Sequence, residues 1–197
     1  MKIYFYFLLV VLLFSCSKKH SGSEYLPECG VGSEYIYTLE LLSIAGKQTG
    51  QLISRVESSE EISGINYNKI VNIYSGIPGL ENEIFFIRYT PEGIYRLEKS
   101  TNSKEQILYP FPLLINTTWN FKDREGYKYE CTVTSNEDLY LPEKTYKNCL
   151  KITWNGKKSY NEVEGLEYLA PGIGVVKSVW KYSGVVMEMV LVKDNCK

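Results

Sequence analysis

The sequence predicts an all-β fold in which an antiparallel meander forms a curved sheet, half-barrel or barrel built from two similar β units. Segments with an apolar residue at every second position follow one another along the chain, and turn-forming residues separate them. Tyrosine accounts for 17 of the 197 residues, and aromatic residues favour strands. After the leading apolar run, no segment keeps the 3.6-residue helical period over three turns, and residues 162–169 are the best short helix candidate.

The predicted strands begin at residue 35. In the first strand, residues 35–41, every second side chain from Tyr35 to Leu41 is apolar and shares one face. We expect a turn at residues 46–50, and proline or glycine breaks at 75–79 and 109–112. The other strands are expected at residues 51–59, 67–74, 83–90, 93–100, 105–109, 119–122, 127–135, 146–154, 159–168, 172–182 and 185–193.

Four segments of the first half recur in the second half, in the same order and at offsets of about 77 to 84 residues. The matched segments are Tyr25 to Tyr37 with Tyr109 to Phe121 (Gly32 aligned with Asn116), and those beginning at Val56 and Val133, Tyr67 and Tyr146, and Tyr89 and Tyr168. We therefore predict one β domain over residues 25–197 with repeats at 25–105 and 106–197. The alternative explanation is chance, because β proteins use the same few residue types in their turns. A single unit would leave an open sheet edge and a small core, which a second unit can close.

The first 16 residues predict an export signal. Lys2 precedes an apolar run, residues 3–14, which is shorter than the roughly 20 residues that span a bilayer and suits the core of a signal peptide. The run ends in Leu13-Phe14-Ser15-Cys16, which resembles the lipobox of bacterial lipoproteins. An ordinary secretory signal or a short membrane anchor is the alternative.

The lipobox resemblance implies a signal peptide over residues 1–15 and a lipidated tether over residues 16–24. Cys16 would carry a diacylglycerol and an acyl chain, and several chains together hold a protein on a membrane. No acidic cluster follows Cys16, where some lipoproteins carry a surface-export signal. We therefore expect an outer-membrane lipoprotein that faces the periplasm.

Four further cysteines, Cys29, Cys131, Cys149 and Cys196, fit an exported chain. A Cys29–Cys196 disulfide would join the two ends of the domain, and two unbonded thiols are the alternative. Cys131 and Cys149 are both missing from the first repeat, which favours a second bridge. Alternation places them on opposite faces of their strands, however, and such side chains bridge only across a bulge. Both pairings therefore stay open.

No catalytic motif emerges from the sequence. The single histidine, His20, lies in the tether, so the usual histidine-dependent triads and zinc sites are not expected. Glu162, Glu164 and Glu167 offer carboxylates for a paired-carboxylate site of glycoside hydrolysis, but a solvated strand face explains them better. The net charge of −1 gives no reason to expect nucleic-acid binding. We expect no enzyme, no metal and no cofactor besides the lipid on Cys16.

The strongest local motif is Tyr168-Leu169-Ala170-Pro171-Gly172-Ile173-Gly174-Val175-Val176-Lys177. It resembles a Tyr-x-Ala-Pro-Gly-x-Gly-x-Val-Lys pattern of uncharacterised bacterial lipoproteins with antiparallel half-barrel domains. More distantly, the chain resembles proteins of the lipoprotein-localisation-factor fold, a half-barrel that binds acyl chains. The proline and glycines of the motif fix a tight turn. The resemblance therefore implies a fold but no activity.

These observations lead to two expected functions. The first is a non-catalytic binding module for an apolar or glycan ligand, with Trp119, Trp154 and Trp180 as candidate ligand-facing aromatics and core packing as the alternative for each. The second is a structural or assembly accessory that binds another envelope protein. A sizeable apolar cavity would favour the first, and a filled interior with an exposed apolar patch would favour the second.

Replacing Cys16→Ser tests the predicted anchor. We expect the variant to lose lipid labelling and to accumulate as a soluble or unprocessed precursor, because the acylated thiol is gone. Metabolic labelling with a fatty acid and membrane fractionation measure both effects. Unchanged labelling and fractionation would contradict lipidation at Cys16.

Overall fold

The computed structural model describes residues 24–26, 28–98, 104–123 and 126–195. These residues form one antiparallel sheet of twelve strands, which confirms the predicted all-β meander. Nowhere in these ranges is there a helix long and apolar enough to cross a membrane. The strands are β1 (Glu34–Ser43), β2 (Gly46–Ile62), β3 (Ile65–Ser75), β4 (Glu83–Thr90), β5 (Gly93–Glu98), β6 (Gln106–Pro110), β7 (Thr118–Lys122), β8 (Lys128–Tyr140), β9 (Thr145–Lys158), β10 (Asn161–Ala170), β11 (Gly174–Tyr182) and β12 (Val185–Asn195).

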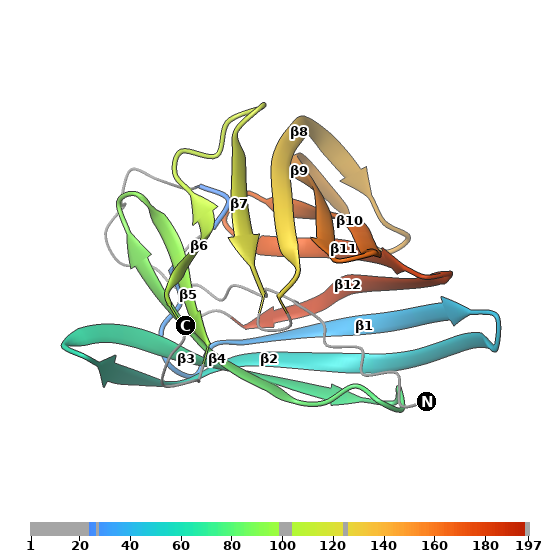
Figure 1. Cartoon of the computed structure of the whole chain (residues 1–197), viewed down its shortest axis with the longest axis horizontal. Helices are drawn as coiled ribbons and strands as arrows, with labels where there is room; N and C mark the ends of the chain where they lie inside the picture. Colours follow the sequence, from blue (N-terminus) through green and yellow to red (C-terminus); the bar gives the residue numbers. More distant parts are fainter. Residues whose placement is uncertain (1–23, 27, 99–103, 124–125, 196–197) are drawn as a thin grey trace.

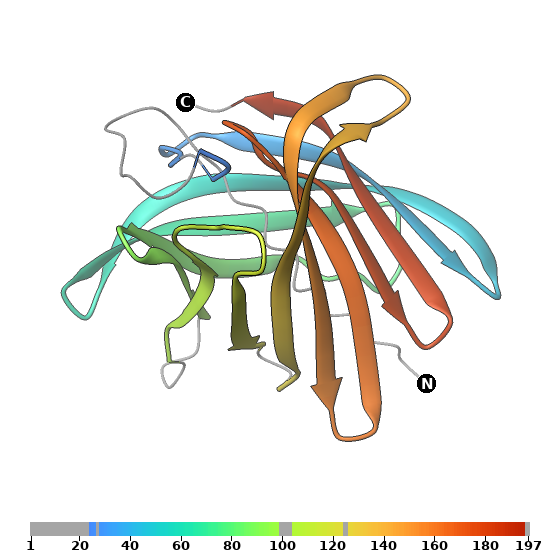
Figure 2. The ribbon, with the colours of Figure 1, turned by 90° about the horizontal axis from the view of Figure 1, so that it is seen from above.

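The sheet curves into a nearly closed barrel (Figures 1 and 2). Its strand order is β6-β5-β4-β3-β2-β1-β12-β11-β10-β9-β8-β7, so the first and last strands of the chain meet in the middle. That junction is a long ladder that runs from Glu34 opposite Asn195 to Leu42 opposite Val186. Only β6 and β7 lie at the ends of this order, and they face each other across the remaining gap, which we call the seam.

Alternation along the strands fills the barrel with large side chains. In β1, Tyr35, Tyr37 and Leu39 have no exposed surface, while Thr38 and Glu40 face solvent. The hydroxyls of the two tyrosines donate hydrogen bonds to the carbonyls of Ile173 and Val175, each at 3.1 Å. The buried polar ends are thereby satisfied, and the aromatic bodies contribute to the core.

The structure corrects three details of the predicted elements. Residues 46–50, predicted as a turn, open β2, because Gly46 pairs with Ser43 and the turn is confined to residues 44–45. Residues 162–169, the helix candidate, lie in β10, where ladders to β9 and β11 on both sides determine the conformation. β6 pairs with β5, so residues 106–110 belong to the first meander, although the predicted repeat boundary assigned them to the second.

The two halves contain the same backbone arrangement before β1 and before β7. The N–H of Gly32 donates to the Val56 carbonyl at 2.9 Å, and that of Asn116 donates to the Val133 carbonyl at 2.8 Å. Gly32 and Asn116 both have positive φ, 86° and 72°. A register shift follows Val56 in β2 and Val133 in β8. These residues are the ones that the repeat alignment pairs, whereas the duplication itself stays a prediction.

Side chains connect β6 to β7 across the seam, where the described residues form no backbone ladder. The Gln106 amide donates from Nε2 to the Lys122 carbonyl and accepts at Oε1 from the Lys122 N–H, both at 2.6 Å. Trp119 donates from Nε1 to the Leu108 carbonyl at 2.8 Å. The Gln106 side chain thus forms the pair of bonds that a neighbouring strand would form.

We predict that Gln106→Ala loosens the seam. Loss of the two Lys122 bonds removes about 1 kcal/mol of local stability, so hydrogen exchange in β6 and β7 should become several-fold faster. Exchange mass spectrometry measures this by segment, with Gln51→Ala, an exposed glutamine on β2, as the matched control. Unchanged exchange in β6 and β7 would show that Gln106 does not hold the seam.

Candidate functional site

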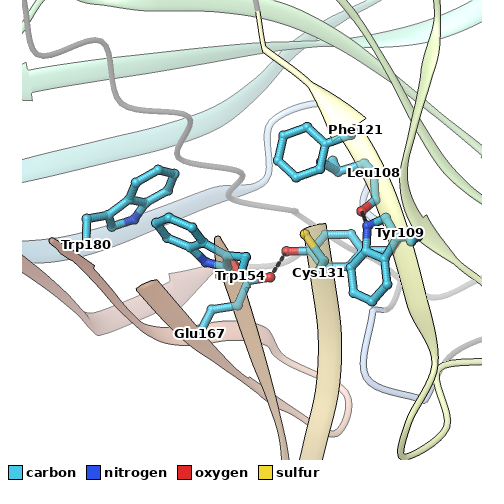
Figure 3. A pocket seen from close by; sticks show the side chains of 8 residues that line it. Leu108, Tyr109, Phe121, Cys131, Trp154, Glu167 and Trp180 are labelled. Atoms are coloured by element: carbon cyan, nitrogen blue, oxygen red, sulfur yellow. Dashed lines mark hydrogen bonds between the residues drawn. The ribbon is translucent and has the colours of Figure 1, made fainter. Parts of the chain in front are cut away.

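A small recess lies inside the barrel next to the seam (Figure 3). Its cavity volume is about 20 Å³, somewhat above the roughly 10–15 Å³ that one water molecule needs. The lining comes from both seam strands and from the wall opposite them: Leu108, Tyr109, Trp119, Phe121, Cys131, Trp154, Glu167 and Trp180. The recess admits a small chemical group, but it does not hold a sugar ring or an acyl chain.

The structure brings the three predicted tryptophans together around the recess. Trp119, Trp154 and Trp180 are 7%, 5% and 9% exposed, so each also belongs to the core. The rings of Trp154 and Trp180 lie with their centroids 4.1 Å apart. Gly165 makes this arrangement possible, because a Cβ there would lie 2.1 Å from the Trp154 ring and 2.3 Å from the Val179 carbonyl oxygen. Whether the tryptophans contact a ligand stays a prediction.

Further aromatic residues fix the tryptophans in place. Tyr129 packs edge-on against Trp154 at 5.7 Å and against Trp180 at 6.5 Å, and it stacks on Phe121 at 4.7 Å. Its hydroxyl donates to the buried Asp123 carboxylate at 3.0 Å. This packing holds one wall of the recess rigid.

Glu167 is the only carboxylic acid in the lining. It projects inward from β10, and the Tyr109 hydroxyl on β6 donates a 2.5 Å hydrogen bond to its Oε1 (Figure 3). Burial raises the pKa of the Glu167 carboxyl to about 7, although the bond from Tyr109 acts in the opposite direction. Burial likewise raises the pKa of the Tyr109 phenol and of the Cys131 thiol, so both stay protonated at neutral pH.

The prediction of a solvated strand face holds for two of the three β10 glutamates. Glu162 and Glu164 are exposed and form ion pairs with Lys157 and Lys181. For Glu167 the prediction is wrong. It lies three residues after Glu164 and five after Glu162, and an odd number of residues along a strand places a side chain on the opposite face. Period-two alternation contained this signal: Glu167 falls in phase with the buried Val163, whereas Glu162 and Glu164 fall out of phase.

The cysteines lie in separate places. Cys29, Cys131 and Cys149 are all buried, and none of the three is bonded to another of them. The Cys131–Cys149 bridge, which the sequence left open, is not formed, because Cys131 pairs with Trp154 and Cys149 pairs with Glu137, which puts them several residues apart along the ladder. Cys149 was expected on a solvated face, but it is buried beside Asn148, where a positive φ of 54° interrupts β9.

Two other predicted site residues, Cys16 and Cys196, lie outside the described residues. The lipidation of Cys16 and the Cys29–Cys196 pairing therefore stay predictions. Across the described ranges, no group of three or more histidine, cysteine, aspartate or glutamate side chains is placed to hold a metal ion.

A second polar cluster lies inside the first half of the barrel, outside the recess lining. Arg96, 7% exposed, places its Nε 2.7 Å from Glu98 and its guanidinium 4.1 Å from the centroid of the Phe85 ring. Glu83 accepts hydrogen bonds from Asn72 Nδ2 and Tyr74 Oη, each at 3.4 Å. Acids and a base offset one another here, which suits a structural role.

The Tyr168–Lys177 motif forms the β10–β11 turn. Gly172 has a φ of 69° at this turn, and its N–H donates to the Glu24 carbonyl at 2.5 Å. The motif therefore fixes the segment that leads into the domain. Tyr25 adds a second attachment there, because its hydroxyl accepts a 3.0 Å hydrogen bond from Asn136.

Comparison with known proteins gives similarity at the level of the fold. No protein-family model matches the sequence, and no curated protein matches it either. A Bacteroides fragilis protein described as exported, with a YmcC-like fold, is 14% identical with a TM-score of 0.51, over 85% of this chain and 97% of that chain. A Parabacteroides distasonis protein described as a lipoprotein is 13% identical with a TM-score of 0.48, over 84% and 96%.

We predict that Glu167→Gln stabilises the protein at alkaline pH. The folded-state pKa of about 7 lies above the unfolded value near 4.3, so the carboxyl's contribution is fully present below about pH 4.3 and is lost as pH rises through 7. Glutamine bears no charge, and the variant should gain on the order of 2–3 kcal/mol over the wild type at pH 8.5 and nothing at pH 4. Urea unfolding at both pH values measures the difference, and Glu164→Gln is the matched control. An equal difference at the two pH values would contradict a raised pKa.

Proposed function

We propose that this chain is a lipid-anchored protein of the bacterial cell envelope, on the outer membrane and facing the periplasm, that acts as a non-catalytic binding module for an apolar or glycan ligand. The lipobox at Cys16 supports the anchor. The fold is shared with a Bacteroides protein described as exported, which supports the location.

The observation that carries the binding proposal is the convergence of Trp119, Trp154, Trp180 and Glu167 on one recess beside the seam. Aromatic walls with a single polar group are typical of ligand sites. Since the recess is small, it would take only a terminal group of the ligand, and the remainder would lie along the seam. The protonated states of Tyr109 and Cys131 support a binding role over a catalytic one, because neither is an activated nucleophile.

We further infer that the two six-stranded meanders descend from one duplicated β unit. The matching hydrogen bonds at Gly32 and Asn116 and the matching register shifts at Val56 and Val133 support this. Duplication would explain why β1 with β12 and β7 with β6 are corresponding junctions, of which one is a ladder and the other is the seam.

The alternative function, a structural accessory that binds an envelope protein, is favoured by a different observation. Large buried side chains pack into the barrel interior of the described residues. The fully exposed Ile44 and Tyr160 lie at the tips of the β1–β2 and β9–β10 hairpins, which project from the same end of the barrel. A partner protein that binds at this end of the barrel would cover both side chains.

Native mass spectrometry of the protein purified from its membrane distinguishes the two functions. For a binding module we expect a bound small molecule whose occupancy falls at least several-fold in Glu167→Gln and is unchanged in Glu164→Gln, the solvent-facing control on the same strand. A wild-type protein without any bound molecule, combined with cross-links from Ile44 and Tyr160 positions to another protein, would overturn binding in favour of the accessory role.

A further inference from the structure

The recess contains an acid without a basic partner. The groups that face the Glu167 carboxyl are Tyr109 from β6, Cys131 from β8 and Tyr37 from β1, all of which are acids with raised pKa values. Its ladder neighbours on β9 and β11, Ile152 and Ser178, carry no charge. Among the described residues no lysine or arginine pairs with Glu167, in contrast to the surface glutamates of the same strand. When it is ionised, this half-buried carboxylate therefore has the Tyr109 hydroxyl bond but no opposite charge to compensate it.

The walls of the recess suit a positive charge. Phe121, Trp119, Trp154 and Trp180 line it, and aromatic faces carry partial negative charge that attracts cations, with tryptophan the strongest. Figure 3 shows Glu167 reaching toward Tyr109, with Trp154 and Trp180 on one side and Phe121 on the other. A carboxylate combined with aromatic walls therefore offers both a counter-ion and cation–π contacts.

The size of the recess restricts the ligand further. A volume of about 20 Å³ leaves room for a group somewhat larger than water, such as a protonated amine, and excludes a sugar ring. An uncharged apolar group of the same size would leave the carboxylate unpaired, and a hydroxyl would supply one hydrogen bond without a charge.

We propose that the recess binds a small organic cation, a protonated primary amine, through the Glu167 carboxylate and the surrounding aromatic side chains. The cation is either a free molecule or the headgroup of a lipid. This inference rests on the proposed function, since it names the terminal group of the ligand that the same recess takes and makes that group cationic.

Binding of a cation requires Glu167 to be ionised, which makes affinity depend on pH. With a carboxyl pKa of about 7, the ionised fraction is close to one at pH 8.5 and about 3% at pH 5.5. The apparent Kd should therefore be about 30-fold weaker at pH 5.5 than at pH 8.5. A neutral ligand that contacts only the aromatic walls would bind without this loss.

Fluorescence titration of the purified full chain tests the proposal, because two of its three tryptophans, Trp154 and Trp180, pack against each other in the recess lining beside the acid. The probes are ethanolamine and 1-propanol, the latter being an uncharged analogue of ethanolamine of matched size. We expect saturable binding of an amine at pH 8.5, about 30-fold weaker binding at pH 5.5, loss in Glu167→Gln and retention in Glu164→Gln. Vesicles of phosphatidylglycerol with and without phosphatidylethanolamine form a second arm. Because the lipid anchor attaches the chain to both, the readout is tryptophan fluorescence, and a change only with vesicles that contain ethanolamine lipid assigns the cation to a headgroup.

Three results would overturn the inference: equal binding of the uncharged analogue, amine binding that Glu167→Gln retains, or no amine binding in either arm. If native mass spectrometry at the same time finds a bound neutral molecule that depends on Glu167, the binding function stands and the cationic ligand class is wrong. If neither experiment finds a ligand, both proposals fail. The Glu167→Gln variant removes no side-chain volume, and its urea unfolding curve shows that it is folded in each titration.

Discussion

The ladder between β1 and β12 is the interaction on which the rest of the structure depends. It pairs the first strand with the last, from Glu34 opposite Asn195 to Leu42 opposite Val186, and so joins two six-stranded meanders into one sheet. Without it each meander would expose two edges and one apolar face, a combination that favours aggregation. The same strand, β1, carries Tyr35 and Tyr37, whose hydroxyl bonds reach β11 carbonyls or the turn before them. Closure and core packing therefore rest on one element.

Several polar side chains in the interior form hydrogen bonds either with a backbone carbonyl or with a side chain from another strand. Tyr109 reaches Glu167 from β6, and Trp119 reaches the Leu108 carbonyl. Glycines at Gly156 and Gly165 leave room for the rings of Tyr129 and Trp154, since a Cβ at either position would overlap them. Large side chains thus surround the recess, which lies where the sheet of the described residues lacks a ladder.

Much of this fold is readable from the sequence, because alternation in strands such as β1 reports which face is buried. The failures have physical causes. Residues 46–50 extend a ribbon exposed on both faces, so no alternation marks them as strand. Cys149 changes burial because Asn148 adopts a positive φ, which a sequence pattern does not reveal. The three tryptophans were predicted as a group, yet Glu167 and the Gln106 bridge were not, since both depend on strands that meet only after the barrel closes.

The unequal junctions of the barrel have a mechanical consequence. The barrel is closed on one side by the β1–β12 ladder and on the other by side-chain bonds across the seam. Because a ladder resists separation better than a few side-chain bonds, thermal distortion concentrates at the seam. Tyr109 lies on β6, and Trp119 and Phe121 lie on β7, the two strands of the seam. Any widening of the seam therefore changes the shape of the space around Glu167 before it disturbs the opposite wall.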